Sequence, residues 1–171
     1  MLPFLNSDNT TDIAEMEGRI PKEFGQDAVE IPGARRLLDD LDALTAPWAV
    51  VTSGTRPLIT GWLERLKLAP PKTLITAEDV ENGKPDPSGY LLGRSRLGVQ
   101  SSDLVVVEDA PAGIAAGKAA GFRVIGLTTT HTADEVRAAG ADWILKDLKS
   151  ASVQGYQAGQ IHLALRSILL T

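Results

Sequence analysis

Short apolar runs that alternate with helix-like segments constrain the fold of this chain more than any other feature. The clearest run is DLVVVED at 103–109, followed by a segment of small residues, APAGIAAGKAAG, at 110–121. A second run, RVIGL, comes next at 123–127. Apolar runs of this length, bounded by turn residues, are typical of buried parallel strands. Strands that alternate with helices predict an α/β fold with a parallel sheet covered on both faces.

The same alternation extends along most of the 171 residues, which is a length typical of one domain. Thr132 and Glu135 are spaced as a capping box, so a helix is predicted to follow Thr132. Thr55 is predicted to cap another helix, with Pro57 in its first turn. The predicted strands are 48–51, 72–76, 103–109, 123–127 and 142–145, and the predicted helices are 33–44, 56–66, 88–98, 110–121 and 133–139.

Two parts of the chain fall outside this pattern. The segment 15–33 is mixed in character and broken by Pro21, Gly25 and Pro32. Near the other end, apolar residues alternate over 161–165, which fits either a strand or a terminal helix.

Composition excludes several classes of protein. The net charge of −5 argues against nucleic acid and anionic membrane surfaces as partners, because a phosphate-rich surface repels an acidic protein. The chain has no cysteine, which excludes disulfides and thiolate metal sites. No apolar run approaches the roughly 20 residues of a membrane span, and the first residues lack the basic start of a signal peptide. A cytoplasmic location is therefore expected.

Reactive side chains follow three of the predicted strands. Thr52 and Ser53 end the first strand, Lys84 lies in a loop after the second, and Glu108 and Asp109 end the third. In an open parallel sheet the carboxyl ends of the strands meet at one edge, where ligands bind. We therefore expect hydroxyl groups, one cation and two carboxylates to converge at this edge.

This set of groups fits a magnesium-bound phosphoryl group. Mg²⁺ takes oxygen ligands and needs only one or two carboxylates, here from Glu108 and Asp109. Phosphoryl oxygens need donors and positive charge, which Thr52, the amides near Ser53 and Gly54, and the Lys84 ammonium could supply. The expected partner is thus a small phosphorylated metabolite.

Lys84 lies in the loop GKPDP at 83–87. Pro85 and Pro87 restrict the backbone in advance, so the lysine loses less entropy when a ligand binds. We interpret the loop as a rigid support that holds the ammonium toward the phosphate and the carboxylates.

Each feature alone also has a plain structural interpretation. Asp109 could serve only as the N-cap of the next helix. His131 and His162 stand apart and are interpreted as structural or surface residues. The glycines of 112–121 favour close helix–sheet packing and are not a dinucleotide fingerprint. A phosphoacceptor receiver domain has similar groups, but its acidic pair comes first in the chain, whereas here it comes last.

Three motifs together resemble the haloacid dehalogenase superfamily of phosphohydrolases. They are VVTSGT, GKPDP and VVVEDAPAGIAAGKAAG, in the order and spacing of the family's second, third and fourth motifs. The residues of these motifs are most similar to those of glycerol-3-phosphate phosphatases and 2-deoxyglucose-6-phosphate phosphatases. The resemblance runs from about residue 13 to 148. It implies a doubly wound, Rossmann-like parallel sheet.

The resemblance also implies roles and domains. Thr52 would bind the transferring phosphoryl group, and Lys84 would bridge that group to the nucleophile. Asp109 would ligate Mg²⁺, with Glu108 in the coordination shell or one water away. By the same resemblance, the chain divides into a remnant of the helical cap and its return linker, the core, and a C-terminal extension, with bounds 1–32, 33–150 and 151–171.

The family's first motif, D-x-D-x-T or D-x-D-x-V, has no counterpart in the sequence. Its two aspartates are the nucleophile and the general acid–base, and it follows the first, central strand. DLDALT at 40–45 is rejected, because Asp40 and Asp42 lie on a predicted helix and are interpreted as solvated, like Asp39. Asp8 and Asp12 also lack a preceding strand. The chain is therefore expected to be N-terminally truncated and inactive alone.

Loss of that strand would leave a gap between the strands that end at Thr52 and Glu108. Unpaired backbone groups cost about 1–3 kcal/mol each, so the gap must be filled or closed if the chain is to be stable alone. Residues 1–5 could fill it, although Pro3 disfavours a central strand. Two hypotheses follow. The chain is either part of a magnesium-dependent sugar- or polyol-phosphate phosphatase that acts through an aspartyl-phosphate, or a catalytically dead remnant with a phosphate-binding, Mg²⁺-binding or regulatory role.

Overall fold

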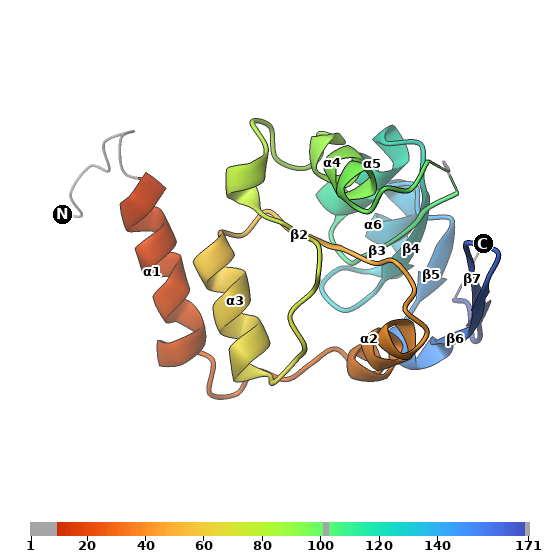
Figure 1. Ribbon diagram of the computed structural model, residues 1–171, viewed down its shortest axis with the longest axis horizontal. Helices are drawn as coiled ribbons and strands as arrows, with labels where there is room; N and C mark the ends of the chain where they lie inside the picture. Colours follow the sequence, from red (N-terminus) through yellow and green to blue (C-terminus); the bar gives the residue numbers. More distant parts are fainter. Residues whose placement is uncertain (1–9, 101–102, 170–171) are drawn as a thin grey trace.

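The computed structural model describes residues 10–100 and 103–169 and contains alternating helices and strands, as predicted (Figure 1). Every predicted strand and helix between 33 and 145 is confirmed, with ends that shift by a few residues. The helices are α1 (Thr10–Glu23), α2 (Ala34–Ala43), α3 (Arg56–Arg65), α4 (Ser88–Arg96), α5 (Pro111–Ala119) and α6 (Ala133–Ala138), with short 3-10 turns η1 (Ala77–Asp79) and η2 (Leu148–Ser150). The strands are β1 (Val50–Val51), β2 (Leu74–Ile75), β3 (Val105–Glu108), β4 (Arg123–Leu127), β5 (Trp143–Leu145), β6 (Ala151–Gln157) and β7 (Gln160–Leu165).

The parallel strands form two separate ladders. One has the order β3-β4-β5, with Val106 beside Val124 and Gly126 beside Ile144. The other is the short pair β1-β2, with Val51 beside Ile75. The loops that carry the candidate site residues follow the carboxyl ends of β1, β2 and β3. Both ladders therefore contribute loops to the candidate site.

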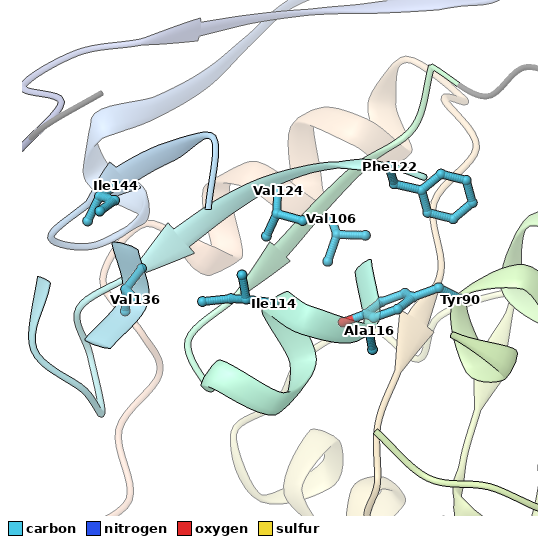
Figure 2. Close-up of a cluster of buried hydrophobic side chains, with 8 residues drawn as sticks. All are labelled: Tyr90, Val106, Ile114, Ala116, Phe122, Val124, Val136 and Ile144. Carbon is cyan, nitrogen blue, oxygen red and sulfur yellow. The ribbon is translucent and has the colours of Figure 1, made fainter. Parts of the chain in front are cut away.

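The main core lies between the larger ladder and helix α5. Figure 2 shows Val106 and Val124 on adjacent strands above Ile114 and Ala116 of the helix. Gly117 makes this contact possible, since a Cβ there would lie 2.9 Å from Val124. The glycines of this helix therefore allow close helix–sheet packing, as the sequence predicted.

No described strand joins β1 to β3, so the gap expected from the sequence is present within the described residues. Helix α4 spans it. Gly89 and Gly93 approach the side chain of Val51, at 3.0 and 3.2 Å from their ideal Cβ positions. On the other side Tyr90 joins the main core with Val106. The two ladders are therefore held together by a helix and not by strand pairing. The alternative that residues 1–5 fill the gap lies outside the described residues.

The interruption predicted at Pro21 is wrong, because α1 continues through it to Glu23. Pro21 lies in the last turn and is buried against α3, where a Cβ on Gly61 would approach its ring to 2.9 Å. Figure 1 shows α1 running beside α3. Among the described residues, no helix has both the length and the apolar character that a membrane crossing requires.

The alternation at 161–165 belongs to a strand, which decides between the two alternatives left by the sequence. Strands β6 and β7 form an antiparallel hairpin with a register shift between Val153 and Gly155. Its two-residue turn, Ala158 and Gly159, has positive φ at both positions, as the favoured hairpin turns require. The sequence missed the hairpin because Ala-Gly is a weak turn signal compared with Asn-Gly.

Helix α3 begins after Thr55 with Pro57 in its first turn, as predicted, but the Thr55 side chain forms no cap hydrogen bond. Carboxylates from other elements accept the nearby amides instead. The Arg56 amide donates to Glu78 at 2.9 Å, and the Thr55 amide donates to Glu17 at 3.1 Å. The capping box of Thr132 and Glu135 is confirmed.

Candidate active site

The loop after β1 is tied to the strand beside it. The Thr52 amide donates to the Ile75 carbonyl at 3.0 Å, and the Ala77 amide donates to the Gly54 carbonyl at 3.1 Å. Within the loop, the Gly54 amide donates to the Thr52 hydroxyl oxygen at 3.1 Å. Ser53 is exposed at the tip. These bonds fix the loop, and within the described residues they leave the Thr52 hydroxyl proton and the Ser53 amide free to donate to a ligand.

The loop that carries Lys84 is fixed by Asp86. Its carboxylate accepts hydrogen bonds from the Ser88 hydroxyl and, at 2.9 Å, from the Ser88 amide. Its own amide donates to the Gly83 carbonyl at 3.1 Å. The Ser88 hydroxyl, and then the Ser88 amide, lower the pKa of Asp86 below its ordinary value. These contacts agree with the interpretation of the loop as a rigid support.

Lys84 reaches across the gap between the two ladders. Its ammonium donates to the Val51 carbonyl of β1 at 3.1 Å and to the Glu108 carboxylate of β3. The ammonium also lies 5.1 Å from the centre of the Tyr90 ring, within the range of a cation–π contact. The lysine therefore contacts the first residue of the predicted acidic pair, and it occupies the place where a strand would otherwise pair with β1.

Glu108 is held by several donors besides Lys84. The Tyr90 hydroxyl donates to it at 2.6 Å, and the amides of Asp109 and Ala110 donate to its other oxygen at 3.2 and 3.4 Å. Burial, and then the charge of Glu108, raise the pKa of the Tyr90 phenol far above its ordinary value, so the phenol remains a donor. The carboxylate is thus engaged on both oxygens.

Sequence reasoning missed two residues that shape the Glu108 environment. Tyr90 lies within the predicted helix 88–98, which gave this residue no role, and the carboxylate that its hydroxyl contacts is 18 positions away. Gly113 leaves room for the carboxyl group, since a Cβ there would lie 2.1 Å from the Glu108 Cδ. The position of Gly113 four residues before Gly117, on one face of a helix that follows a strand, was the available signal.

Asp109 faces a different loop. Its carboxylate accepts a hydrogen bond from Thr129 at 3.0 Å, and its carbonyl lies 3.1 Å from both the Thr130 hydroxyl and His131 Nδ1. The prediction that His131 stands apart is wrong, because the β4–α6 loop brings it to this residue. The N-cap of α5 is Ala110 and not Asp109, so the plain capping interpretation is also wrong. His162 is exposed on β7.

A cavity of about 140 Å³ lies between the loop after β1 and the Lys84 loop. This is several times the roughly 10–15 Å³ that one water needs. It brings together three of the predicted phosphate-binding residues, but Gly54 and the acidic pair are not part of its wall. The lining residues are Val51, Thr52, Ser53, Ile75, Ala77, Val80, Glu81, Asn82, Gly83, Lys84, Asp86, Gly89 and Tyr90.

The two carboxylates differ in how well they suit Mg²⁺. Both oxygens of Glu108 already accept hydrogen bonds, so this carboxylate has little capacity left for direct ligation. Asp109 has one oxygen bound to Thr129 and a second for which no bond is recorded in the described part of the chain. Within residues 10–100 and 103–169, no three acidic or histidine side chains cluster as a metal site. Asp109 therefore fits the role of a direct ligand better than Glu108 does.

Among the described residues, none of the rejected aspartates hydrogen-bonds to Thr52, Lys84, Glu108 or Asp109. Asp40 and Asp42 are on α2, as predicted, and Asp42 accepts a hydrogen bond from the Trp48 indole at 2.8 Å. Asp39 and Asp42 are exposed and Asp40 is half-buried. Asp12 is exposed on α1, and Asp8 lies outside the described residues.

Residues 4–127 match the sequence model of the family described as Haloacid dehalogenase-like hydrolase. The chain belongs to this family. The resemblance read from its motifs is thereby confirmed, as is the α/β fold. Among solved structures, this haloacid dehalogenase-like chain is similar to a hydrolase from Pseudomonas syringae, with a TM-score of 0.74, 26% identity, and coverage of 85% of this chain and 67% of that one.

Two curated relatives of this haloacid dehalogenase-like chain come from Saccharomyces cerevisiae. It is 46% identical over 154 residues to glycerol-1-phosphate phosphohydrolase 2, which covers 85% of this chain and 62% of the yeast protein. It is 38% identical over 168 residues to 2-deoxyglucose-6-phosphate phosphatase 1, which covers 88% of this chain and 68% of the yeast protein. The chain thus spans less than two thirds of the length of the first of these relatives.

Proposed function

We propose that this chain is part of a phosphomonoester hydrolase that acts on small sugar or polyol phosphates through an aspartyl-phosphate. The names of its relatives support this substrate class, since they act on glycerol 1-phosphate and 2-deoxyglucose 6-phosphate. The observation that carries the proposal is the cavity shared by Thr52, Ser53 and Lys84 at the carboxyl ends of β1 and β2.

In this proposal, Thr52, Ser53, Gly54 and Lys84 hold the phosphoryl oxygens. The Lys84 ammonium has three donors, and two of them are directed at Val51 and Glu108. The third can point into the cavity that the lysine lines. Glu108 and Tyr90 would then act as positioning residues, because both contact the ammonium; Tyr90 also lines the cavity, whereas Glu108 does not.

Magnesium is the proposed cofactor. Asp109 would hold it directly and Glu108 one water away, with phosphate oxygens and waters completing the ligands that Mg²⁺ prefers. When bound, the ion would neutralise charge that develops on the phosphoryl group. The bond from Thr129 to Asp109 would keep one carboxylate oxygen oriented.

Aspartyl-phosphate chemistry also needs a nucleophilic aspartate and a general acid, and the described aspartates that were considered for these roles lie on helices and not at the end of a strand. Asp40 and Asp42 are on α2, and Asp12 is on α1. We therefore propose that both groups come from a segment beyond the 171 residues, and that these residues alone bind phosphate without hydrolysing esters. We further propose that 1–32 are a cap remnant, 33–150 the core and 151–171 an extension.

Two assays test this function. With Mg²⁺, the 171-residue chain should release no phosphate from glycerol phosphate or 2-deoxyglucose 6-phosphate. A chain extended at its N-terminus by an apolar strand ending in D-x-D-x-T should release it, and Lys84→Met in that extended chain should abolish release, while the exposed control Lys22→Met should not. An extended, folded chain that binds phosphate but releases none would favour the alternative, a phosphate- or magnesium-binding remnant.

A further inference from the structure

A second and larger cavity, of about 510 Å³, borders β2. It is bordered by α3, by the segment that leads into β2, and by the end of α4. β2 pairs only with β1 among the described strands, so this cavity lies along the free edge of β2. It shares no lining residue with the first cavity; its own are Arg56, Thr60, Leu63, Pro70, Pro71, Lys72, Thr73, Leu74 and Arg96.

The charge of this wall is unusual for an acidic chain. Arg56, Lys72 and Arg96 line it and no acidic residue does, although the whole chain has a net charge of −5. One carboxylate, that of Asp79, lies behind the arginines and pairs with both, at 2.7 and 2.8 Å. Glu78 adds a second carboxylate, which accepts the Arg56 amide at the start of α3 at 2.9 Å. Three cations against these two carboxylates leave an excess of one positive charge.

Asp79 fixes both guanidinium groups in place. It is itself anchored by the Thr76 amide and hydroxyl, each at 2.9 Å. Arg96 also donates to the Leu74 carbonyl at 3.3 Å. Each guanidinium has five N–H donors and uses at most two in these bonds, so donors remain on both arginines.

The remaining cation has no such role in the structure. Lys72 is exposed and forms no recorded hydrogen bond or ion pair with the described part of the chain. Two oriented guanidinium groups and one unpaired ammonium around one hollow are the donors that a phosphate dianion requires. Leu63, Pro70 and Pro71 supply an apolar wall beside them.

We propose that this cavity is a second anion site, which binds a phosphate monoester with a compact organic body. The phosphate would lie among Arg56, Lys72 and Arg96, and the body would contact Leu63 and the two prolines. A volume of about 510 Å³ exceeds what a bare phosphate fills and falls in the range of roughly 300–1,000 Å³ of small-molecule sites. This site goes beyond the proposed hydrolysis, which concerns the other cavity.

The test is a titration of the isotope-labelled 171-residue chain, followed by backbone amide shifts, with inorganic phosphate and with phenyl phosphate as probes. The amides of Thr73 and Leu74 should shift and saturate, with phenyl phosphate bound more tightly than inorganic phosphate. Lys72→Met keeps the aliphatic stem and should weaken binding there about tenfold, the loss expected for one charge-assisted contact. The exposed Lys22→Met lines neither cavity and should leave binding unchanged.

Binding at each cavity can be followed by its own set of amide shifts. Lys84→Met should abolish the phosphate-induced shifts at Ser53 and Gly83 but leave those at Thr73 intact. Lys72→Met should weaken binding at Thr73 about tenfold and leave the shifts at Ser53 and Gly83 intact. The second site is refuted if Thr73 and Leu74 do not shift in the folded chain, or if Lys72→Met binds as tightly as the unmodified chain. Shifts at Thr73 without shifts at Ser53 would support the second site and count against the proposed function.

Discussion

The two parallel ladders are built in opposite ways. In β3-β4-β5, residues 124–127 are buried and the ladder packs on α5 in a continuous apolar core. In β1-β2, each strand has two residues, and only Ile75 of the four is buried. Stability therefore resides mainly in the larger ladder, whereas both candidate ligand cavities border the smaller one. Ligand-binding segments are commonly drawn from the less stable part of a protein.

The bridge between the ladders is polar as well as apolar. Helix α4 packs on β1 through Gly89 and Gly93, and it inserts Tyr90 into the larger core. Lys84 and Glu108 then join the ends of β1 and β3. This ion pair thus crosses the part of the sheet that a paired strand would normally fill. The different stabilities of the two ladders can be tested by mutating either ladder or this pair.

The largest effect is expected inside the larger ladder. Ile125 is 2% exposed, and Ile125→Ala should lower the free energy of unfolding by about 2–5 kcal/mol through lost burial and a cavity. Leu74 is half-buried in the smaller ladder, and Leu74→Ala should cost roughly half as much. Urea unfolding of both variants measures the difference. Equal losses would contradict the uneven distribution of stability.

The second-largest effect is expected from the ion pair of Lys84 and Glu108, which joins the two ladders. Lys84→Met leaves Glu108 without its cation, and should cost about 2–3 kcal/mol, less than the roughly 3–5 of a fully buried pair because the two side chains are 17% and 10% exposed. A double-mutant cycle with Glu108→Gln isolates the pairwise energy.

The stability lost in Lys84→Met should be lost mainly from the smaller ladder. Hydrogen exchange at the Thr52 amide, which bonds to Ile75, should accelerate more than at Val124 in the larger ladder. A coupling energy near zero, with exchange raised equally in both ladders, would show that α4 alone joins them.

The strands and helices could be predicted because their apolar runs and caps are local signals. RVIGL and the box of Thr132 and Glu135 need no distant partner to be recognised. The hairpin β6–β7 was not predicted, because its turn residues Ala158 and Gly159 have no strong preference that marks a turn. Pro21 was misinterpreted since its position is set by contact with Gly61, far along the chain.

The candidate site could likewise be predicted only in part from the sequence. The motif order predicted which loops converge, and Thr52 and Lys84 do line one cavity. The sequence placed both carboxylates beside Lys84. It could not show that the ammonium bonds to Glu108 while Asp109 accepts from Thr129, because Thr129 comes from a loop 20 positions along the chain. Nor could it show the contribution of Gly113, which consists of a missing Cβ beside a carboxyl group.

A smaller effect is expected from Asp79, which supports the second cavity. The Thr76 amide, and then the Arg96 guanidinium, lower its pKa from 3.8 to about 2. Since the folded pKa is the lower one, the stabilisation is present above about pH 4 and is lost as pH falls toward 2. Asp79→Asn should cost about 1–2 kcal/mol at pH 7, because its arginine partners are half-exposed and screened.

The measurement for Asp79 is urea unfolding at several pH values. The difference between the variant and the unmodified chain should be constant from pH 7 to 5 and shrink between pH 4 and 2. Asp12→Asn, which removes an exposed carboxylate from α1, serves as the matched control. A difference that grows as the pH falls would have the wrong sign for this account.

The smallest effect has the opposite sign. Thr55 is 8% exposed, and its hydroxyl oxygen has no hydrogen-bond partner within the described residues. It does not cap α3, so Thr55→Val removes a desolvated polar group without loss of a bond and should stabilise the chain by about 1 kcal/mol. The control is Thr76→Val, where the buried hydroxyl donates to Asp79 at 2.9 Å and its loss should destabilise by about 1 kcal/mol. Thermal unfolding should therefore move the two midpoints in opposite directions; a loss of stability in both variants would mean that the Thr55 hydroxyl has a partner after all, and that the smaller ladder is more completely bonded than its contacts indicate.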